Sequence, residues 1–213
     1  MYLWGGMSRT VIFKNSSNRI SFAQRFLSER LDSLKKDVTI CIEKTCPFPA
    51  LLYCFSTIDL LGSLYEGEAT GNTKTHGNRA SPTRKAKEYM INVMKYPPCE
   101  IKLLQNQFRH KLVHLAQPET ITYDNSIKKM IGWELHNRYN GKHMFVEPLP
   151  SKQTVVTLAP YKMEADAVFI ISIEKLVEDI LISSKDYLKI LKNSARLQKN
   201  FDNAICDIYD AMA

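Results

Sequence analysis

The chain has little that would commit it to a membrane, to secretion or to a disulfide framework. No apolar run approaches the about 18 uninterrupted residues of a transmembrane helix, and the N-terminus lacks the charged-then-apolar order of a signal peptide. The five cysteines are odd in number and scattered, and none has the two-residue spacing of metal ligands. These absences predict a cytoplasmic protein with reduced thiols and neither a disulfide nor zinc. Cys54 and Cys99 stand in apolar sequence and are expected in the core.

Several catalytic signatures are missing as well. The sequence has no glycine-rich phosphate loop, no nucleophilic serine or cysteine constellation and no carboxylate pair at a convincing spacing. It does have an excess of cations, because 29 Lys and Arg against 22 Asp and Glu leave a formal charge of +7. This charge favours partners that carry phosphate, such as nucleic acid, but does not indicate where on the protein they would bind. A solvated basic surface is the commoner explanation.

Hydrophobic periodicity predicts a mainly α-helical domain over residues 11–213, with residues 1–10 as an N-terminal extension. Four helices are expected in the first half, at residues 21–44, 49–67, 82–94 and 100–116. The second is apolar nearly all the way round and stops at Gly67, so it should be the buried central helix. The polar residues 68–81 between the second and third helices predict a loop. Its Lys74, His76 and Arg79 could touch a polyanion, although a solvated connector is favoured.

A β insertion is expected at about residues 121–165, before helical periodicity returns over residues 168–213 with a break near residues 190–197. Alternating residues centred on Asn140 and Gly141 predict an antiparallel hairpin of residues 131–138 with residues 143–149, and residues 154–160 could add a third strand. In that register His136 and His143 share a face. An exposed polar surface is favoured there over a metal site, since Arg138 lies between them.

The stretch LLQNQFRHKLVHLAQP, residues 103–118, places four cations within the fourth helix. On a helical wheel the core stripe consists of Ile101, Leu104, Phe108, Leu112 and Leu115. His110 and His114 fall on the opposite face, together with Leu103 and Gln107, and Arg109 lies on the flank. This outward, mixed face suits a partner surface or a cleft. The alternative is a pair of solvated histidines, which the helix dipole also favours near a C-terminus.

The residue types of this stretch also suit chemistry. Histidine can shuttle protons near neutral pH, and arginine gives a permanent bidentate grip on phosphate oxygens, so together they are sufficient for metal-independent RNA cleavage. RHKLVH, residues 109–114, resembles the R-x(4-6)-H motif of the HEPN superfamily, in which Asn, Asp or His typically follows the arginine. YCFSTIDLLGSLYEG, upstream, is similar to the Tyr- and Asp-bearing helix of such proteins. The resemblance covers roughly residues 49–118.

The resemblance implies a HEPN-like helical bundle that forms a homodimer, with a composite site where two motif helices face each other. It implies a metal-independent endoribonuclease of RNA that needs neither a metal nor a cofactor. It also implies a role in toxin–antitoxin systems or defence, with an antitoxin or a nucleotidyltransferase as candidate partner. In this reading His114 is the general base or acid, Arg109 stabilises charge on the phosphorane and His110 positions the substrate or His114. Lys111 and Gln107 are the candidates for binding substrate.

Asp59 is an acid between Ile58 and Leu60 in the apolar part of the second helix, so it should accept hydrogen bonds or meet a cation. A local bond to a neighbouring helix or to Tyr53 is favoured, and the functional alternative is that it holds Arg109 or a histidine in place. Two rivals to the ribonuclease remain open. One is a non-catalytic dimeric module that binds nucleotide or RNA or regulates a partner, and the other is an oligomer interface with no nucleic acid.

Overall fold

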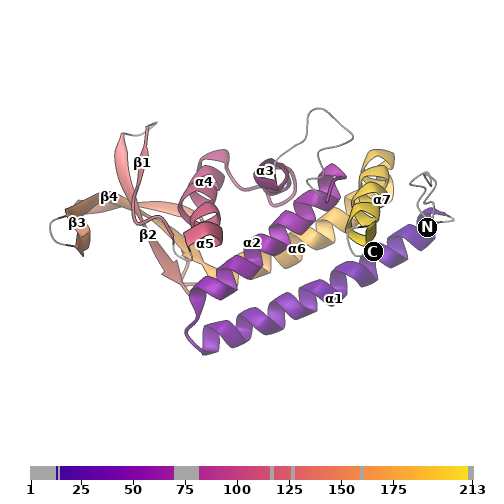
Figure 1. Cartoon of the computed structure of the whole chain (residues 1–213), viewed down its shortest axis with the longest axis horizontal. Helices are drawn as coiled ribbons and strands as arrows, with labels where there is room; N and C mark the ends of the chain where they lie inside the picture. Colours follow the sequence, from indigo (N-terminus) through magenta and orange to yellow (C-terminus); the bar gives the residue numbers. More distant parts are fainter. Residues whose placement is uncertain are drawn as a thin grey trace, which may run out of the picture.

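The computed structural model describes residues 13, 15–69, 82–115, 118–125, 128–158 and 161–210. The N-terminal extension and the loop with Lys74, His76 and Arg79 lie outside the described residues, so the expectations about them stay predictions. The fold consists of helices with a four-stranded mixed sheet inserted before the two C-terminal helices (Figure 1). The start of helix α1 (Ser16–Glu43) and helix α7 (Ala195–Asp210) lie at the end of the molecule that is farthest from the sheet (Figure 1).

The first two predicted helices are confirmed. Helix α1 spans Ser16–Glu43 and begins at Asn15, whose side chain accepts the Asn18 N–H at 2.8 Å. Helix α2 spans Pro47–Glu66 and ends at Gly67, whose φ of 85° closes the helix in the left-handed conformation. Since α2 contacts α1, α3, α5, α6 and α7, it is the central helix. Among the described helices it alone is long and apolar enough to cross a membrane, and more than half of it is buried within the fold.

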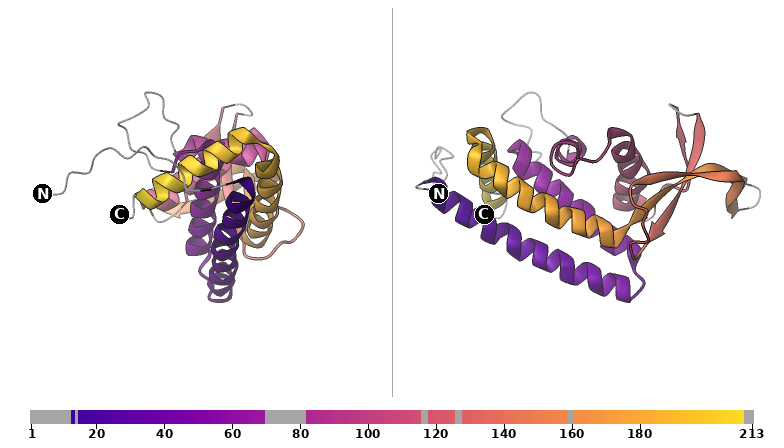
Figure 2. Two further views of the ribbon diagram at one scale, coloured as in Figure 1. Left: turned by 90° about the vertical axis from the view of Figure 1, so that its right-hand side faces the viewer. Right: turned by 180° about the vertical axis from the view of Figure 1, so that it is seen from behind.

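The remaining helices surround α2. Helix α3 spans Pro82–Asn92, and the two C-terminal helices are α6, Ile173–Asn193, and α7, Ala195–Asp210. The break at Ser194 falls within the predicted residues, and Figure 2 shows α1 and α6 side by side along the bundle. The predicted fourth helix is continuous from Pro98 to Leu115 but has three parts: α4 (Pro98–Leu103), the π-helical η1 (Leu104–Arg109) and α5 (His110–Leu115).

Gly62 lets α2 and α3 approach each other closely. A Cβ atom at Gly62 would lie 2.7 Å from the main-chain carbon and oxygen of Lys85 and 2.8 Å from the Ala86 nitrogen. Because these are backbone atoms, the helices would have to separate. We expect Gly62→Ala to lower the free energy of unfolding by about 2 kcal/mol, within the usual range for overpacking. Denaturant unfolding beside Ser56→Ala, an exposed position of α2, measures this, and equal stability of the two variants would contradict the packing argument.

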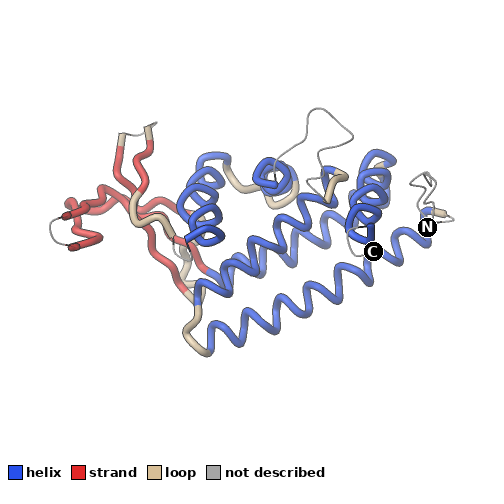
Figure 3. Tube along the Cα trace, in the orientation of Figure 1, coloured by secondary structure: helices blue, strands red, loops and turns tan. Residues whose placement is uncertain are grey.

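The sheet closes one end of the bundle (Figure 3). Its strands are β1 (Thr122–Asp124), β2 (Lys129–His136), β3 (Phe145–Leu158) and β4 (Tyr161–Ser172), in the order β1-β2-β4-β3. Strands β2 and β4 are parallel, and the other pairs are antiparallel. Trp133 of β2 and Phe169 of β4 contact the Phe108 ring at centroid distances of 5.7 and 6.4 Å. The sheet therefore packs directly on the continuous helix from Pro98 to Leu115, called the motif helix below because it carries RHKLVH.

The predicted hairpin is wrong. Strand β4 lies between β2 and β3, so residues 131–138 and 143–149 do not pair with each other. The apolar run of β4, from Ala167 to Ile171, is buried best as an inner strand with a neighbour on each side. Glu174 instead ties down the connection between β2 and β3, accepting the Tyr139 N–H and an Arg138 N–H, both at 2.8 Å. The turn signal at Asn140 and Gly141 thus lies within a longer loop, where Gly141 keeps a φ of 95°.

Two further expectations need correction. Residues 168–172 were expected at the start of a helix but complete β4, because β-branched and aromatic residues favour a strand, and the helix begins only after the N-cap Ser172. Cys99 was expected in the core but is exposed in the first turn of α4, where its thiol donates to Glu100 at 2.7 Å. Cys54 is buried, as predicted.

Candidate functional site

Arg109 is held by Asp59. The Arg109 Nε lies 3.1 and 3.2 Å from the two carboxylate oxygens, and Nη2 lies 2.7 Å from Oδ2. This bidentate pair joins the motif helix to α2 and confirms that Asp59 meets a cation on a neighbouring helix. The Tyr53 side chain makes no hydrogen bond to Asp59 in the described part of the chain, so the expected support from Tyr53 is not found.

Helix α3 supplies a third contact. The Arg109 Nη1 donates to the Thr83 hydroxyl at 3.0 Å, so Asp59 and Thr83 together occupy three of the five guanidinium N–H groups. The Arg109 side chain is 12% exposed and that of Asp59 is 30% exposed. The guanidinium is therefore fixed in one orientation at the edge of the core. Arg109 was expected on the flank of the helix, and its pairing with Asp59 is one of the alternatives that the sequence left open.

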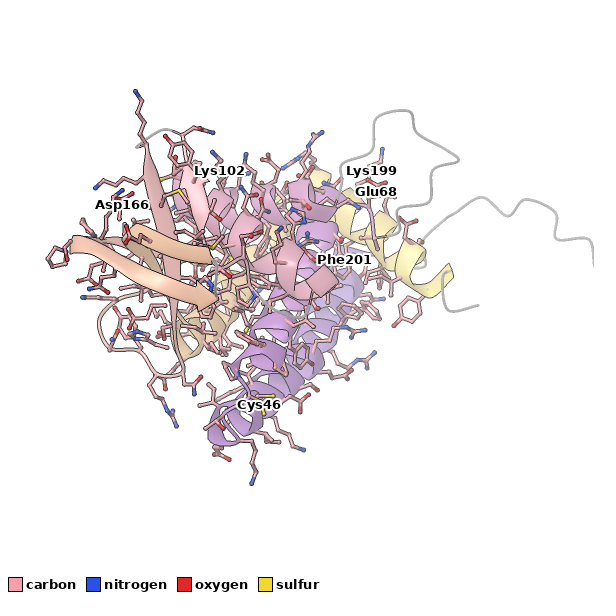
Figure 4. All side chains as sticks on the ribbon, turned by 60° about the vertical axis from the view of Figure 1, so that its left-hand side comes forward. Cys46, Glu68, Lys102, Asp166, Lys199 and Phe201 are labelled. Carbon is pink, nitrogen blue, oxygen red and sulfur yellow. The ribbon has the colours of Figure 1, made fainter. Side chains whose placement is uncertain are left out.

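Positive charge gathers around Asp59. Burial raises the pKa of its carboxyl, and the hydrogen bonds and charge of Arg109 and the charges of His110 and Lys85 act in the opposite direction. The Lys85 ammonium is almost fully buried, and it donates to the Glu68 carbonyl at 2.7 Å. Figure 4 shows Glu68 on the helical side of the molecule, far from Asp166 of the sheet. The carboxylate of Asp59 thus lies near two permanent cations, Arg109 and Lys85, and near the His110 imidazole.

A shallow depression of about 360 Å³ begins at His110, the residue after Arg109, and neither Arg109 nor Asp59 lines it. The motif helix lines one wall with Asn106, His110 and Lys111, and the segment that leads into β1 forms the other with Glu119, Ile121 and Thr122. His110 is half-buried here. The depression is therefore lined by His110 together with polar side chains, whereas the Arg109 guanidinium lies on the side of the helix that contacts α2 and α3.

The two candidates for substrate binding do not both reach this depression. Lys111 lines it and forms an ion pair with Glu119 across it. Gln107 is fully buried, and its Nε2 donates to the main-chain oxygen of Ile131 in β2 at 2.6 Å. Because no part of the Gln107 side chain is accessible, its predicted contact with substrate is wrong.

The π-helical turn explains why the helical wheel failed here. His110 donates its N–H to the Gln105 carbonyl, five residues earlier, rather than four. One extra residue in a turn rotates the following positions by about 100° relative to the preceding ones. Leu103 and Gln107 consequently lie in the core, away from the face of His110. The core stripe of Ile101, Leu104, Phe108 and Leu112 is confirmed.

His114 belongs to α5, one turn after His110, but its side chain lies outside the described part of the structure, so its role stays a prediction. His136 bonds Glu134 at 2.7 Å on the surface, as expected for a polar position. His143 does not share a face with His136, because it is buried between the sheet and α6. Within the described residues, no cluster of three His, Cys, Asp or Glu side chains is arranged to hold a metal ion.

A second, larger depression of about 520 Å³ lies between α1 and α6 and shares no residue with the motif. Its floor is formed by apolar side chains of both helices, and Arg138, Tyr139, Glu174 and Lys175 stand at its edge. The cations Arg138 and Lys175 are both paired with carboxylates of α6. The cluster around Asp59 combines acid, base and cation candidates more closely, so it is the better candidate site.

No protein family, curated protein or solved structure matches this chain.

Proposed function

We propose that the chain is a metal-independent endoribonuclease of the HEPN type, with a helical bundle built around an R-x4-H site. The observation that supports it best is the bidentate pairing of Arg109 with Asp59, in which Thr83 fixes the third side of the guanidinium. Such preorganised donors stabilise charge that develops in a transition state, because they need no reorganisation during the reaction. His110, the next residue, faces the adjacent open depression.

In the proposed reaction the ribose 2′-hydroxyl attacks the adjacent phosphorus and the 5′-oxygen of the next nucleotide leaves. His114 removes the proton of the 2′-hydroxyl or supplies one to the leaving oxygen, and His110 positions the substrate or His114. Arg109 stabilises the phosphorane through the N–H groups that Asp59 and Thr83 do not occupy. The products end in a 2′,3′-cyclic phosphate and in a 5′-hydroxyl, and no step uses a metal.

A second copy of the chain completes the site in this proposal. The depression beside His110 is open and shallow on one chain, so by itself it encloses little of a substrate. Two motif helices facing each other would form a deeper cleft with two sets of Arg109, His110 and His114. This arrangement makes cleavage depend on dimerisation.

The test is incubation of the purified protein with mixed RNA in a chelator, followed by analysis of the fragment ends. We expect the wild type to cleave and to leave cyclic phosphates, and His114→Ala and His110→Ala to lose most of the activity. Lys185→Ala, an exposed lysine of α6, is the matched control and should cleave like the wild type. The proposal would be contradicted if the chelator abolished cleavage, or if His114→Ala still cleaved RNA.

The second candidate is a non-catalytic module that binds RNA or nucleotide. It is favoured by one observation: the depression lined by His110 and Lys111 is open and shallow, which suits contact with a nucleic-acid surface better than enclosure of a reacting group. Binding that weakens with salt, without turnover by any variant, would support this candidate over the enzyme.

A further inference from the structure

Gln107 is the most deeply buried polar side chain of the motif helix, with no exposed surface. Its Nε2 lies 2.6 Å from the Ile131 oxygen and 3.5 Å from the Gly132 oxygen, both on the main chain of β2. Its Oε1 has no hydrogen-bond partner among the described residues. Turning the amide over would bring this oxygen against two carbonyls, so the orientation is fixed. A buried acceptor without a partner costs stability.

The main chain of Gln107 is tethered as well. Its carbonyl accepts the Glu119 N–H at 2.7 Å, which joins η1 to the segment that leads into β1. Two residues earlier in the same turn, Gln105 donates to the Thr83 oxygen of α3 at 2.9 Å. Besides the bonds of Arg109, the π-helical turn is thus attached to its surroundings at three points, and two of them belong to Gln107.

These tethers have a consequence for the candidate site. Arg109 ends η1 and His110 begins α5, so both follow Gln107 within a single turn. If η1 relaxed to an ordinary α-helix, the residues after it would rotate by about 100° relative to those before it. Arg109 would then leave Asp59 and Thr83, and His110 would leave the depression. Only the π register keeps both contacts.

We propose that Gln107 is a positioning residue, which pins the motif helix to β2 in the π register and thereby places Arg109 on Asp59 and His110 in the depression. An apolar residue at this fully buried position beside Phe108 would bring no unpaired acceptor of its own, although it would give up the bond to Ile131. The presence of a glutamine at position 107, despite its cost in stability, is explained by the placement of Arg109 and His110. The link to cleavage rests on the proposed function, whereas the placement of Arg109 concerns this chain alone.

The experiment compares Gln107→Met with the wild type by three measurements. Thermal unfolding should show a midpoint close to that of the wild type, since methionine fills the space and removes the unpaired Oε1 together with the bond to Ile131. In nitrogen-15 NMR spectra, the Arg109 Nε–H signal should be protected from solvent exchange in the wild type and lose this protection in the variant. The kcat for RNA should fall about 100-fold with little change in KM, because the catalytic groups are displaced.

Gln198→Met is the matched control. Gln198 of α7 also donates its amide to main-chain carbonyls, those of Leu191 and Lys192, both at 3.1 Å. This variant loses the same kind of bond far from the motif in sequence, and should keep the Arg109 signal and the wild-type kcat. Gln107→Asn should also lose the protection of the Arg109 signal, because its shorter side chain cannot reach Ile131 in the observed geometry.

The outcomes separate this inference from the proposed function. A folded Gln107→Met with an unchanged Arg109 signal overturns the inference, whatever the RNA assay shows. Loss of folding in both Gln107 variants overturns it too, because Gln107 would then be a structural residue. If the wild type cleaves no RNA but the Arg109 signal still loses protection in both folded variants, the positioning role holds and the ribonuclease proposal fails.

Discussion

Arg109→Lys is expected to lower the rate of metal-independent RNA cleavage about 100- to 1000-fold, the loss typical for removal of one preorganised donor of an oxyanion site. The charge is conserved, but a lysine ammonium cannot bond both oxygens of Asp59 side-on and reach Thr83 at the same time. The group that faces the phosphate would lose its fixed orientation. Initial rates in chelator, with circular dichroism to verify folding, measure the effect.

The control for this substitution is Arg138→Lys. Arg138 pairs with Glu174 at 2.8 Å on the surface, where its side chain is 70% exposed, so the change costs little stability and leaves the motif intact. We expect Arg138→Lys to cleave at the wild-type rate. An Arg109→Lys variant that is as active as this control would show that the Asp59 pair is structural and does not serve catalysis.

Acid should destabilise the fold through His143. Burial lowers the pKa of His143 from 6.5 to about 4, with the Lys175 charge acting in the same direction and Asp179 in the opposite one. Its Nδ1 accepts the Ser172 N–H at 3.0 Å, and its Nε2 lies 3.1 Å from the Tyr96 hydroxyl, which donates to Asp179 at 2.7 Å. This chain of bonds suits a neutral imidazole, because Nδ1 must remain an acceptor.

The direction of the pH effect follows from this lowered pKa. Between pH 6.5 and pH 4 the unfolded chain binds a proton at His143 and the folded chain does not, so stability is complete above pH 6.5 and falls as the pH approaches 4. The loss over this window should be roughly 3 kcal/mol. Denaturant unfolding at pH 7 and at pH 4.5 measures most of it.

Other groups also titrate in acid, so variants are needed to show that the loss of stability comes from His143. His143→Asn retains an oxygen near the position of Nδ1 and should lose stability at pH 7 but show a much flatter pH dependence. His136→Asn, at the surface histidine that bonds Glu134, should keep the wild-type dependence. A wild type and a His143→Asn variant with parallel curves would contradict the assignment to His143.

The sequence predicted α1 and α2 well, because apolar periodicity and helix-terminating residues depend only on neighbouring positions in the chain. The apolar stripe of α1, the proline near the start of α2 and Gly67 at its end determine those elements without help from distant parts of the chain. Tyr65 of α2 and Tyr89 of α3 follow the same apolar periodicity and lie in the core with a centroid distance of 6.2 Å. The turn signal at Asn140 failed, since strand pairing depends on which strand can be buried between two others.

The candidate site was predictable only in part. An acid in an apolar helix must find a partner, so the pairing of Asp59 with Arg109 was among the expected alternatives. The π-helical turn was not foreseen, because its tethers join η1 to Thr83 of α3, to β2 and to the segment before β1, and these come together only in the folded chain. This missed turn displaced Gln107 from the surface to the core. A glutamine pair at positions 105 and 107, amid apolar residues, is the one sequence signal that could have suggested it.

The most direct test of the proposed reaction uses one RNA oligonucleotide and a copy with a 2′-deoxyribose at the cleaved position, each incubated with the wild-type protein in a chelator. If the 2′-hydroxyl is the nucleophile, the protein cuts the RNA, leaves a cyclic phosphate there and spares the modified copy at that position. Cleavage of both strands at the same position would contradict the account, because another nucleophile would then have to attack the phosphorus.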